Sequence, residues 1–329
     1  MFPTLMLRSA VAAFTTVATL TLLGTAAAPL PARAAGPMVK TQPGWYRLML
    51  GDFEITALSD GSVKLPVKDL LTNTTPAKVE QALKRSHIAH PVETSVNAYL
   101  INTGAKLVMV DAGAGTLFGP TLGALTGSLK AAGYTPDQVD EIYITHLHPD
   151  HVGGLAAEGK AVFPNAVVRM DKADADFWLS QANLDKAPET SKGFFKGAQA
   201  SLKPYQDAGR VKPFEGDTEL VPGVRAIASR GHTPGHTIYQ VESKGEKLML
   251  WGDLMHVAAV QFPQPATTIS FDTDSKQAMR QRTKAYAEAA RQQYLVGAAH
   301  LSFPGLGYLR KDAGGPGYTW VPANYSSLR

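Results

Sequence analysis

The amino-terminal half of the chain alternates apolar and polar residues in short runs. Residues 45–50 and 53–58 alternate on either side of Gly51 and Asp52, and residues 96–102 and 106–110 flank a short loop at 103–105. A period of two is typical of strands with one buried face, and short connections containing glycine favour hairpins. The pattern therefore predicts two antiparallel strand pairs in this half.

Helical spacing follows and then alternates with further strands. Leucines three or four residues apart precede Gly133, which predicts an amphipathic helix that ends at this glycine. Apolar runs that predict later strands cover residues 141–144, 166–170, 224–229, 238–243, 247–251 and 294–298. Asp274 and Gln277 form a capping pattern that predicts the start of a long helix. The predicted inner face of this helix consists of Met279, Thr283, Tyr286 and Ala290.

Residues 188–207 have a helical pattern that is interrupted by Gly193 and Gly197. Glycine weakens the interior of a helix, so this segment is predicted to be a lid or an insert rather than a core helix. No internal repeat and no linker divides the chain after its amino terminus. Residues 35–329 are therefore predicted to form one domain.

The first 34 residues differ in composition from the rest of the chain. They contain Arg8 and Arg33 but no acidic residue, and an apolar stretch at 10–28 precedes Ala32-Arg33-Ala34. This pattern predicts a secretory signal peptide over residues 1–34 and a periplasmic or secreted mature protein. Threonines and a glycine dilute the apolar stretch, so no membrane contact is expected after cleavage.

Charge and cysteine content narrow the classes of function. The formal charge of +4 falls to +2 without the two arginines of the signal peptide, and so mild a balance predicts no nucleic-acid partner. The chain has no cysteine, which excludes thiol catalysis and cysteine-rich metal sites. Any metal site must therefore use nitrogen and oxygen ligands.

A dense group of such ligands follows the predicted strand at 141–144, in the sequence His146-Leu147-His148-Pro149-Asp150-His151. Residues two apart in an extended chain point to the same side, so His146 and His148 could chelate one ion. Pro149 suits the first turn of a helix and would direct Asp150 and His151 to a neighbouring ion. The motif therefore predicts two metal ions.

Three more candidate ligands, His232, Asp253 and His300, each stand just beyond a predicted strand. Seven donors exceed the needs of one four-coordinate ion, whereas two ions that share Asp253 use about this many and leave a position for water. Mixed imidazole and carboxylate ligation favours zinc, and manganese, cobalt and iron also accept it. Water between two such ions would become a hydroxide nucleophile near neutral pH, oriented by the catalytic carboxylates Asp150 and Asp253.

These residues together resemble the metallo-β-lactamase superfamily, whose His-x-His-x-Asp-His signature is met in full from His146 to His151. The resemblance implies an α/β fold, the αββα four-layer sandwich. It also implies that the metal ligands are His146, His148 and His232 for one ion, Asp150, His151 and His300 for the other, and Asp253 as the bridge. His236 is expected to support its own turn, and Asp111 to orient a ligand imidazole.

Residues 50–61 and 297–305 are most similar to the branch of methyl parathion hydrolases and aryl-lactone (dihydrocoumarin) hydrolases. This implies a binuclear hydrolase of aryl esters, lactones and organophosphate triesters. The aromatic substrate wall of these enzymes would fall on Phe118, Trp178 and Phe195. Further substrate-binding positions, where the organophosphate-specialised form has smaller or differently shaped residues, are His256, Ile269 and Phe271. That difference favours flat aromatic lactones over phosphotriesters.

Several other activities share this ligand set. Cleavage of acyl-homoserine lactones differs only in whether the pocket accepts a long acyl tail. β-Lactamases and thioesterases of the glyoxalase type use similar ligands but different substrate pockets. A metal-binding module without activity needs no substrate pocket. Flavodiiron oxidoreductases typically carry glutamate at the position of His148, which argues against that class. An apolar region near Phe194 and Phe195 is compatible with a homodimer.

Overall fold

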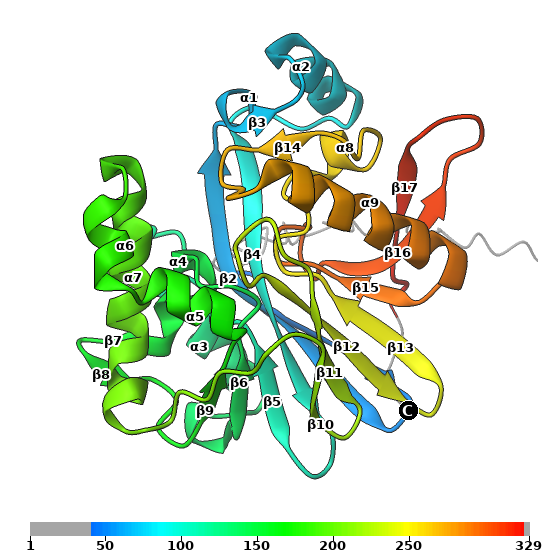
Figure 1. The fold of residues 1–329 in the computed structure, drawn as a ribbon. Helices are drawn as coiled ribbons and strands as arrows, with labels where there is room; N and C mark the ends of the chain where they lie inside the picture. Colours follow the sequence, from blue (N-terminus) through cyan, green and yellow to red (C-terminus); the bar gives the residue numbers. More distant parts are fainter. Residues whose placement is uncertain (1–40, 326–329) are drawn as a thin grey trace, which may run out of the picture. The chain divides into compact units, whose positions relative to one another are not determined.

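Two β-sheets packed face to face form the centre of the protein (Figure 1). The computed structural model describes residues 41–325, so the predicted signal peptide lies outside the described residues. The first sheet contains β1 (Trp45–Leu50), β2 (Phe53–Leu65), β4 (Val92–Asn102), β5 (Leu107–Val110), β6 (Glu141–Tyr143) and β9 (Val167–Arg169), in that order. The second contains β10 (Thr218–Val221), β11 (Val224–Ala228), β12 (Thr237–Ser243), β13 (Glu246–Leu250), β15 (Leu295–Gly297), β16 (Leu306–Lys311) and β17 (Tyr318–Pro322).

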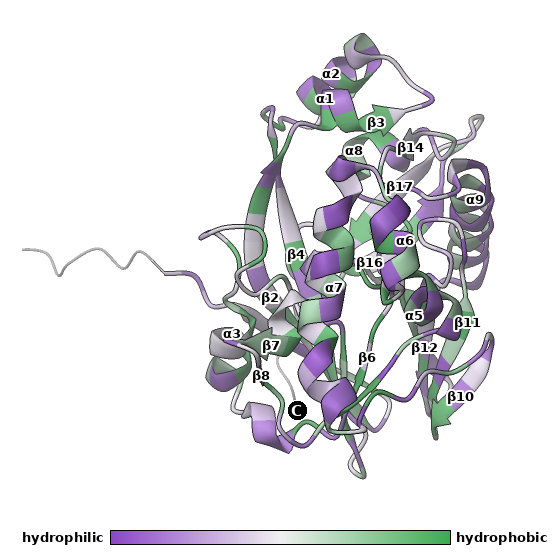
Figure 2. Cartoon of the chain, turned by 60° about the vertical axis from the view of Figure 1, so that its left-hand side comes forward, coloured by the Kyte–Doolittle hydropathy of each residue, from purple (hydrophilic) through white to green (hydrophobic). Residues whose placement is uncertain are grey.

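Helices cover the outer face of each sheet. Buried residues of α3 (Leu125–Ala131), α5 (Lys172–Trp178) and α7 (Glu189–Asp207) share an apolar cluster with the first sheet, and α9 (Ser275–Gln292) shares one with the second. The outward face of α9 is largely hydrophilic (Figure 2). The predicted αββα sandwich is therefore confirmed. Within residues 41–325, no helix combines the length and apolar character that a bilayer span requires.

Shorter elements complete the fold around this sandwich. The remaining helices are α1 (Val67–Leu70), α2 (Pro76–Arg85), α4 (Pro149–Val152), α6 (Gln181–Lys186) and α8 (Ala258–Gln261). Two small strand pairs join β3 (Leu71–Thr72) to β14 (Thr268–Ile269) and β7 (Ala156–Ala157) to β8 (Lys160–Ala161). Both expected hairpins form, since β1 pairs with β2 and β4 pairs with β5 in antiparallel register. The sequence prediction missed the hairpin of β16 and β17.

Parallel strand pairs in both sheets bring distant segments to one edge. β6 lies parallel to β5 and to β9, and β13 lies parallel to β15. Neighbouring parallel strands end at the same edge, so the loops after them lie side by side. The loops that follow β5, β6, β13 and β15 contain Asp111, the histidine motif, Asp253 and His300, respectively.

The prediction that residues 188–207 form a lid or insert was wrong. They form the continuous helix α7, and its residues Phe195, Ala198 and Leu202 are buried in the core against the first sheet. A β-carbon at Gly197 would lie 3.2 Å from atoms of both Leu117 and Pro149, so this glycine permits the close approach of α7 to α4. Tertiary packing therefore outweighs the low helix propensity of glycine.

The predicted inner face of α9 was only partly right: Tyr286 is fully buried and Ala290 packs against the core, but the face as a whole is shifted. Asp274 caps the helix as predicted by accepting a hydrogen bond from the Gln277 amide. Thr283 is exposed, and the buried positions are Ala278, Arg282, Ala285, Tyr286 and Ala289. The buried guanidinium of Arg282 donates hydrogen bonds to the carbonyl oxygens of Pro265, Leu254 and Thr267. Because a hydrophobic pattern assigns arginine to the surface, the prediction placed Arg282 outside and chose an inner face turned away from the observed one.

The two glycines of α7 provide a test of this packing. Gly193→Ala is expected to raise the free energy of unfolding by about 0.5–1 kcal/mol, because alanine restricts the unfolded chain and no atom lies within 4 Å of the new methyl group. Gly197→Val is expected to lower it by about 1–3 kcal/mol through overlap with Leu117 and Pro149. Urea unfolding measures both, and stabilisation by both variants would contradict the close approach.

Candidate metal centre

Short loops at one edge of the sandwich carry the predicted ligands. His146 and His148 lie between β6 and α4, and His148 is the residue that precedes α4. Pro149 occupies the first turn of this helix, as its sequence position predicted, and Asp150 and His151 follow it. The three remaining candidates come from the second sheet, with His232 between β11 and β12, Asp253 after β13 and His300 after β15.

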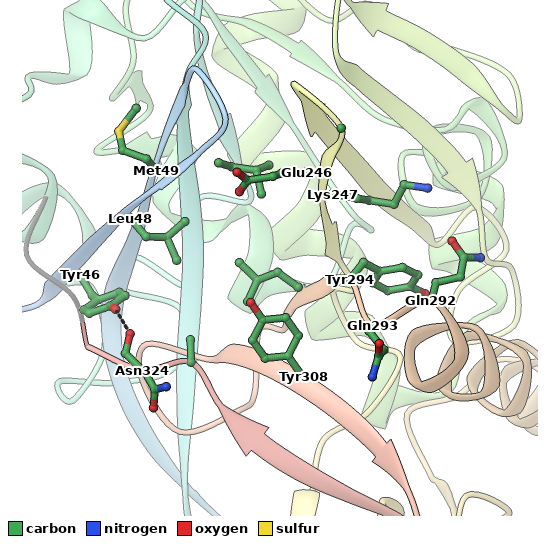
Figure 3. A pocket seen from close by; sticks show the side chains of 14 residues that line it. Tyr46, Leu48, Met49, Glu246, Lys247, Gln292, Gln293, Tyr294, Tyr308 and Asn324 are labelled. Atoms are coloured by element: carbon green, nitrogen blue, oxygen red, sulfur yellow. Dashed lines mark hydrogen bonds between the residues drawn. The ribbon is translucent and has the colours of Figure 1, made fainter. Parts of the chain in front are cut away.

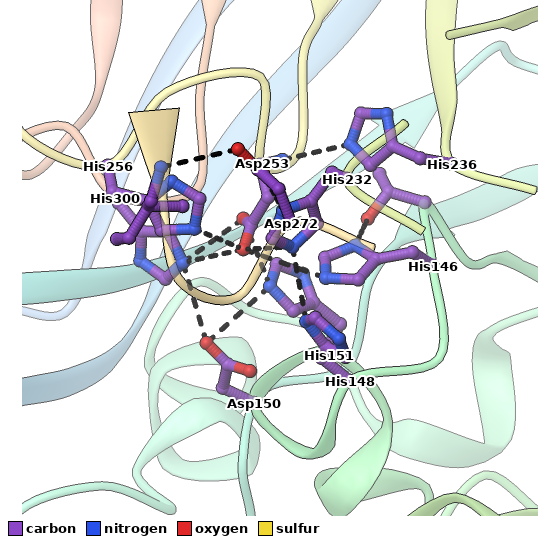
Figure 4. A network of polar contacts seen from close by, with 12 residues as sticks. His146, His148, Asp150, His151, His232, His236, Asp253, His256, Asp272 and His300 are labelled. Atoms are coloured by element: carbon purple, nitrogen blue, oxygen red, sulfur yellow. Dashed lines mark hydrogen bonds and ion pairs between the residues drawn. The ribbon is translucent and has the colours of Figure 1, made fainter. Parts of the chain in front are cut away.

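The seven side chains form two groups that share Asp253 (Figure 4). The first group consists of His146, His148, His232 and Asp253, and the second consists of Asp150, His151, Asp253 and His300. Within each group the donor atoms lie within 4.8 Å of one another. All are buried except Asp150, which is partly exposed. These are the two sets that the resemblance implied.

Asp253 lies between the two groups. Its Oδ2 is 3.3 Å from His232 Nε2 and 3.6 Å from His146 Nε2. Its Oδ1 is 3.1 Å from His151 Nε2 and 3.0 Å from His300 Nε2. Oδ1 therefore faces the second group, whereas Oδ2 faces the first group and also lies 3.2 Å from His300 Nε2. A carboxylate between the two groups in this way could join two cations.

The unpaired atoms of the site fit two divalent cations. His146 Nε2 is buried and makes no hydrogen bond, and His151 Nε2 and Asp253 Oδ1 make none either, although they lie 3.1 Å apart. Nitrogens His232 Nε2 and His148 Nδ1 are 3.1 Å apart, close to the roughly 3.3 Å between two nitrogen ligands on a tetrahedral zinc ion. Because unpaired polar atoms are costly to bury, a cation in each group would supply what the protein atoms lack.

The protonation states suit the same interpretation. Burial lowers the pKa of His146 and His148 well below the usual value, so their rings are neutral and their lone pairs are free. Burial by itself would raise the pKa of Asp253, but the surrounding His300, His151 and His256 lower it well below its usual value. Burial by itself would lower the pKa of His151, His232 and His300, but Asp253 beside each of them raises it, to about 9 for His232. Because neutral imidazoles and ionised carboxylates are the forms that ligate metals, these three rings would release protons when cations bind.

Other residues hold the imidazoles in place. Asp111, predicted to orient a ligand, has its Oδ2 2.8 Å from His151 Nδ1. Asp272 does the same for His232, with 2.9 Å between Asp272 Oδ1 and His232 Nδ1. The sequence analysis missed Asp272, because it lies far from the histidine motif and follows no long strand. Contacts of this kind fix the tautomer of a ligand histidine.

His236 supports the loops and is not in either group. Its Nδ1 lies 3.0 Å from the Ser229 carbonyl oxygen, and its Nε2 accepts a hydrogen bond from the Asp253 amide. Burial lowers the pKa of His236 to about 3, so the ring is neutral and Nε2 can accept. The sequence interpretation of His236 as a support for its turn agrees with this geometry.

Asp174 is a further buried support that the sequence analysis missed. Its carboxylate accepts hydrogen bonds from the amide of Leu147, between two candidate ligands, and from the amide of Gly235, near His232. It therefore ties the β6–α4 loop to the β11–β12 loop. Burial raises the pKa of Asp174 to about 6, although hydrogen bonds from Thr233, Leu147 and Gly235 lower it.

A cavity of about 270 Å³ opens directly on the two groups. Its lining includes His148, Asp150, Asp253 and His300 together with Val63, Leu65, Phe118, Leu122, Phe194, His256 and Phe271. A larger cavity of about 590 Å³ (Figure 3) lies near Lys247 and Leu295, at the amino ends of β13 and β15. The candidate ligands lie beyond the carboxyl ends of these strands, so this larger cavity does not open on them.

The predicted substrate wall is only partly present in this cavity. Phe118, His256 and Phe271 line it. Trp178 and Phe195 line a separate cavity of about 290 Å³, and Ile269 is fully buried in the core. Phe194 takes the place of Phe195, because successive residues of a helix point about 100° apart and only one of them can face the ligands.

Trp178 and His256 contact the candidate ligands in other ways. The Trp178 ring packs edge-on against His148, with 5.1 Å between ring centroids. His256 lies at the wall with its ring stacked on His300, and its Nε2 is 3.0 Å from Asp253 Oδ2. Trp178 therefore supports a candidate ligand from outside the cavity, whereas His256 provides a polar group on the cavity wall.

The chain belongs to the metallo-β-lactamase superfamily, since the model of that family matches residues 91–286. Together with the two histidine and aspartate groups, this makes the protein a metal-dependent hydrolase of that superfamily. The crystal structure of hydrolase AbOPH in the beta lactamase superfamily is similar, with 37% identity and a TM-score of 0.83 over 88% of this chain and 100% of that chain.

Lactonases are also among the similar proteins. The structure of AidC, a dizinc quorum-quenching lactonase, in complex with a product is 29% identical, with a TM-score of 0.80 over 86% of this chain and 99% of that chain. An N-acyl homoserine lactonase of a Bacillus species is 32% identical over 116 residues, which are 35% of this chain and 38% of that protein. The chain thus matches well under half the length of this lactonase.

The buried carboxyl of Asp174 predicts a dependence of stability on pH. The pKa of Asp174 is about 6 in the folded protein, above the usual 3.8. The protonated carboxyl therefore favours the folded state, and this contribution to the free energy of unfolding is present below about pH 4 and is lost as the pH rises through about 6. Relative to Asp174→Asn, the metal-free wild type should lose about 3 kcal/mol of stability between about pH 4 and 7. Urea unfolding at both pH values measures this, and parallel pH profiles would contradict it.

Proposed function

We propose that the protein is a two-metal hydrolase of aryl esters and aryl lactones. The observation that carries this proposal is the apolar wall of the cavity beside the candidate metal groups. Apart from His256 and the candidate ligands, all the side chains that line it are aliphatic or aromatic, namely Val63, Leu65, Phe118, Leu122, Phe194 and Phe271. Such walls bind a flat apolar ring and exclude water.

The seven donors would hold the two ions, for which we propose zinc. Bound divalent ions at such a site lower the pKa of water and polarise an acyl oxygen. The partly exposed carboxylate of Asp150 lies on the cavity lining, where it can accept a hydrogen bond from attacking water. Asp253 is held by the hydrogen bond from its amide to His236, and its carboxylate also lies on the cavity lining, where it can orient the same water.

The aromatic wall determines which bond is presented to this water. An aryl ring packed against Phe194 and Phe271, which contact each other edge-on on the cavity wall, would place its acyl carbon near Asp150 and Asp253. The oxygen of water bonds to this carbon while the bond from carbon to the aryl oxygen breaks, and the proton passes to Asp150 or to solvent. A phenolate is a good leaving group, and in an aryl lactone it stays attached to the product.

Phosphotriester hydrolysis is proposed as a secondary activity. The resemblance to methyl parathion hydrolase supports it, because the same ligands can polarise a phosphoryl oxygen. A tetrahedral phosphorus centre with two alkoxy arms needs more room than a planar acyl group, and this cavity has a volume of only about 270 Å³.

Acyl-homoserine lactonase activity is the second candidate function. The likeness to AidC and to the Bacillus lactonases supports it. An acyl-homoserine lactone carries an amide, and within the described cavity His256 is the one polar side chain outside the candidate ligands. Periplasmic or secreted location and a homodimer remain predictions from the sequence.

A substrate panel tests the proposed function. We expect kcat/KM for dihydrocoumarin to exceed that for an acyl-homoserine lactone by about tenfold or more, because an unpaired buried amide group costs about 1–3 kcal/mol. It should also exceed that for an aryl dialkyl phosphate, whose tetrahedral centre needs more room. A cephalosporin should not be turned over. If the acyl-homoserine lactone were the preferred substrate, the second candidate function would replace the first.

Metal removal tests the dependence on the seven donors. Chelation should abolish hydrolysis, and zinc, cobalt or manganese should restore it. His146→Ala should lose bound metal and more than about a hundredfold of activity, since even residues that only orient ligands contribute about 10–100-fold. The matched control is His87→Asn at an exposed histidine, where φ is +55° and asparagine tolerates this backbone conformation. Full activity of the metal-free enzyme would refute the proposal.

A further inference from the structure

We propose that Asp272 is a positioning residue that couples the first metal group to the wall of the substrate cavity. The inference rests on the proposed function, because it assigns the metal group and the cavity to one reaction. Asp272 lies next to Phe271, which lines the cavity, and its side chain contacts His232 of the first group. Asp272 thus contacts the first metal group with its side chain and adjoins a residue of the cavity wall along the backbone.

The side chain of Asp272 orients the ring of His232. Its Oδ1 lies 2.9 Å from His232 Nδ1, and only 1% of the side chain is exposed. A carboxylate partner keeps a proton on Nδ1, which leaves Nε2 as the nitrogen that would bind a cation, and Nε2 points toward His148 Nδ1 and Asp253 Oδ2. These atoms are 3.1 and 3.3 Å from His232 Nε2.

The same segment is bonded along its backbone to the loop of His232. The amide of Thr273 donates to the carbonyl oxygen of His232 at 2.9 Å, and the amide of Asp274 donates to that of Gly231 at 2.8 Å. The second carboxylate oxygen of Asp272 accepts from the Ile269 amide at 3.3 Å. Residues 269–274 and the His232 loop are therefore joined at several points and should shift together.

Phe271 makes the hydrogen bonds between residues 269–274 and the His232 loop relevant to substrate choice. Its ring packs against those of Phe194 and His256, which also line the cavity, with centroids 6.3 and 6.1 Å away. A change in the Asp272 contact would therefore alter both the orientation of His232 and the position of an aromatic wall residue. We expect metal affinity of the first group and substrate selectivity to change in the same variant.

The second metal group offers a matched comparison. Asp111 contacts His151 at 2.8 Å in the same way, but its other hydrogen bonds come from the amide and hydroxyl of Thr145, which does not line the cavity. Asp111 therefore orients a ligand without joining it to the wall. Asp272→Asn and Asp111→Asn each remove one carboxylate charge beside a candidate ligand histidine and keep the shape of the side chain.

The experiment measures zinc stoichiometry and affinity of the full-length protein by competition with a chelator. It also measures kcat/KM for dihydrocoumarin and for an acyl-homoserine lactone at saturating zinc. We expect each variant to lose about 10–100-fold in affinity for one of two ions. The ratio of the two kcat/KM values should change severalfold in Asp272→Asn and stay at the wild-type value in Asp111→Asn. Phe271→Leu should change the ratio and leave zinc affinity unchanged.

The outcomes separate this inference from the proposed function. If the wild type bound no zinc, the proposed function would fail. If the wild type bound two ions and Asp272→Asn kept both affinities, or lost affinity with an unchanged ratio, the coupling through Asp272 would be refuted. If Asp272→Asn fails to fold, NMR of the cobalt-loaded wild type tests whether Asp272 orients His232. Slow exchange of the His232 Nδ1 proton with solvent is expected, and exchange as fast as that of an exposed histidine would refute the orienting role.

Discussion

The structure depends on Asp253 and the six imidazole and carboxylate groups around it, all of which are buried except the partly exposed Asp150. Buried charged and polar groups are unfavourable unless they have partners, and several donors of this site have none within the protein. The surrounding residues serve to hold the groups in this arrangement rather than to neutralise them. Asp111, Asp272 and His236 each make hydrogen bonds that fix a ring or a loop, and Asp174 joins two loops from behind.

The sandwich makes such a site possible because each sheet supplies part of it. Loops after the first sheet carry His146, His148, Asp150 and His151, whereas loops of the second carry His232, Asp253 and His300. The two halves meet because both sheets contain parallel strands that end at the same edge. Packing of the sheets against each other therefore also fixes the distance between ligands from the two halves of the chain.

The sequence by itself determined the candidate ligands and the class of fold. Ligands need particular atoms at particular spacings, and a motif such as His146 to His151 records both in local sequence. Strand pairs such as 45–50 with 53–58 were likewise predictable, since alternation reports directly which face is buried. Asp111 and His236 could be assigned supporting roles because each lies close in sequence to a strand end or a candidate ligand.

Only the tertiary structure decided what surrounds those ligands. Which of Phe194 and Phe195 faces the cavity depends on the rotation of α7, and that rotation is set by contacts of Gly197 with Pro149 and Leu117. Asp272 and Asp174 become supports through contacts with loops 40 and 27 residues away. Arg282 is buried because three carbonyl oxygens converge on it. Contacts between distant segments leave no periodic pattern in either segment, so local sequence could not predict them.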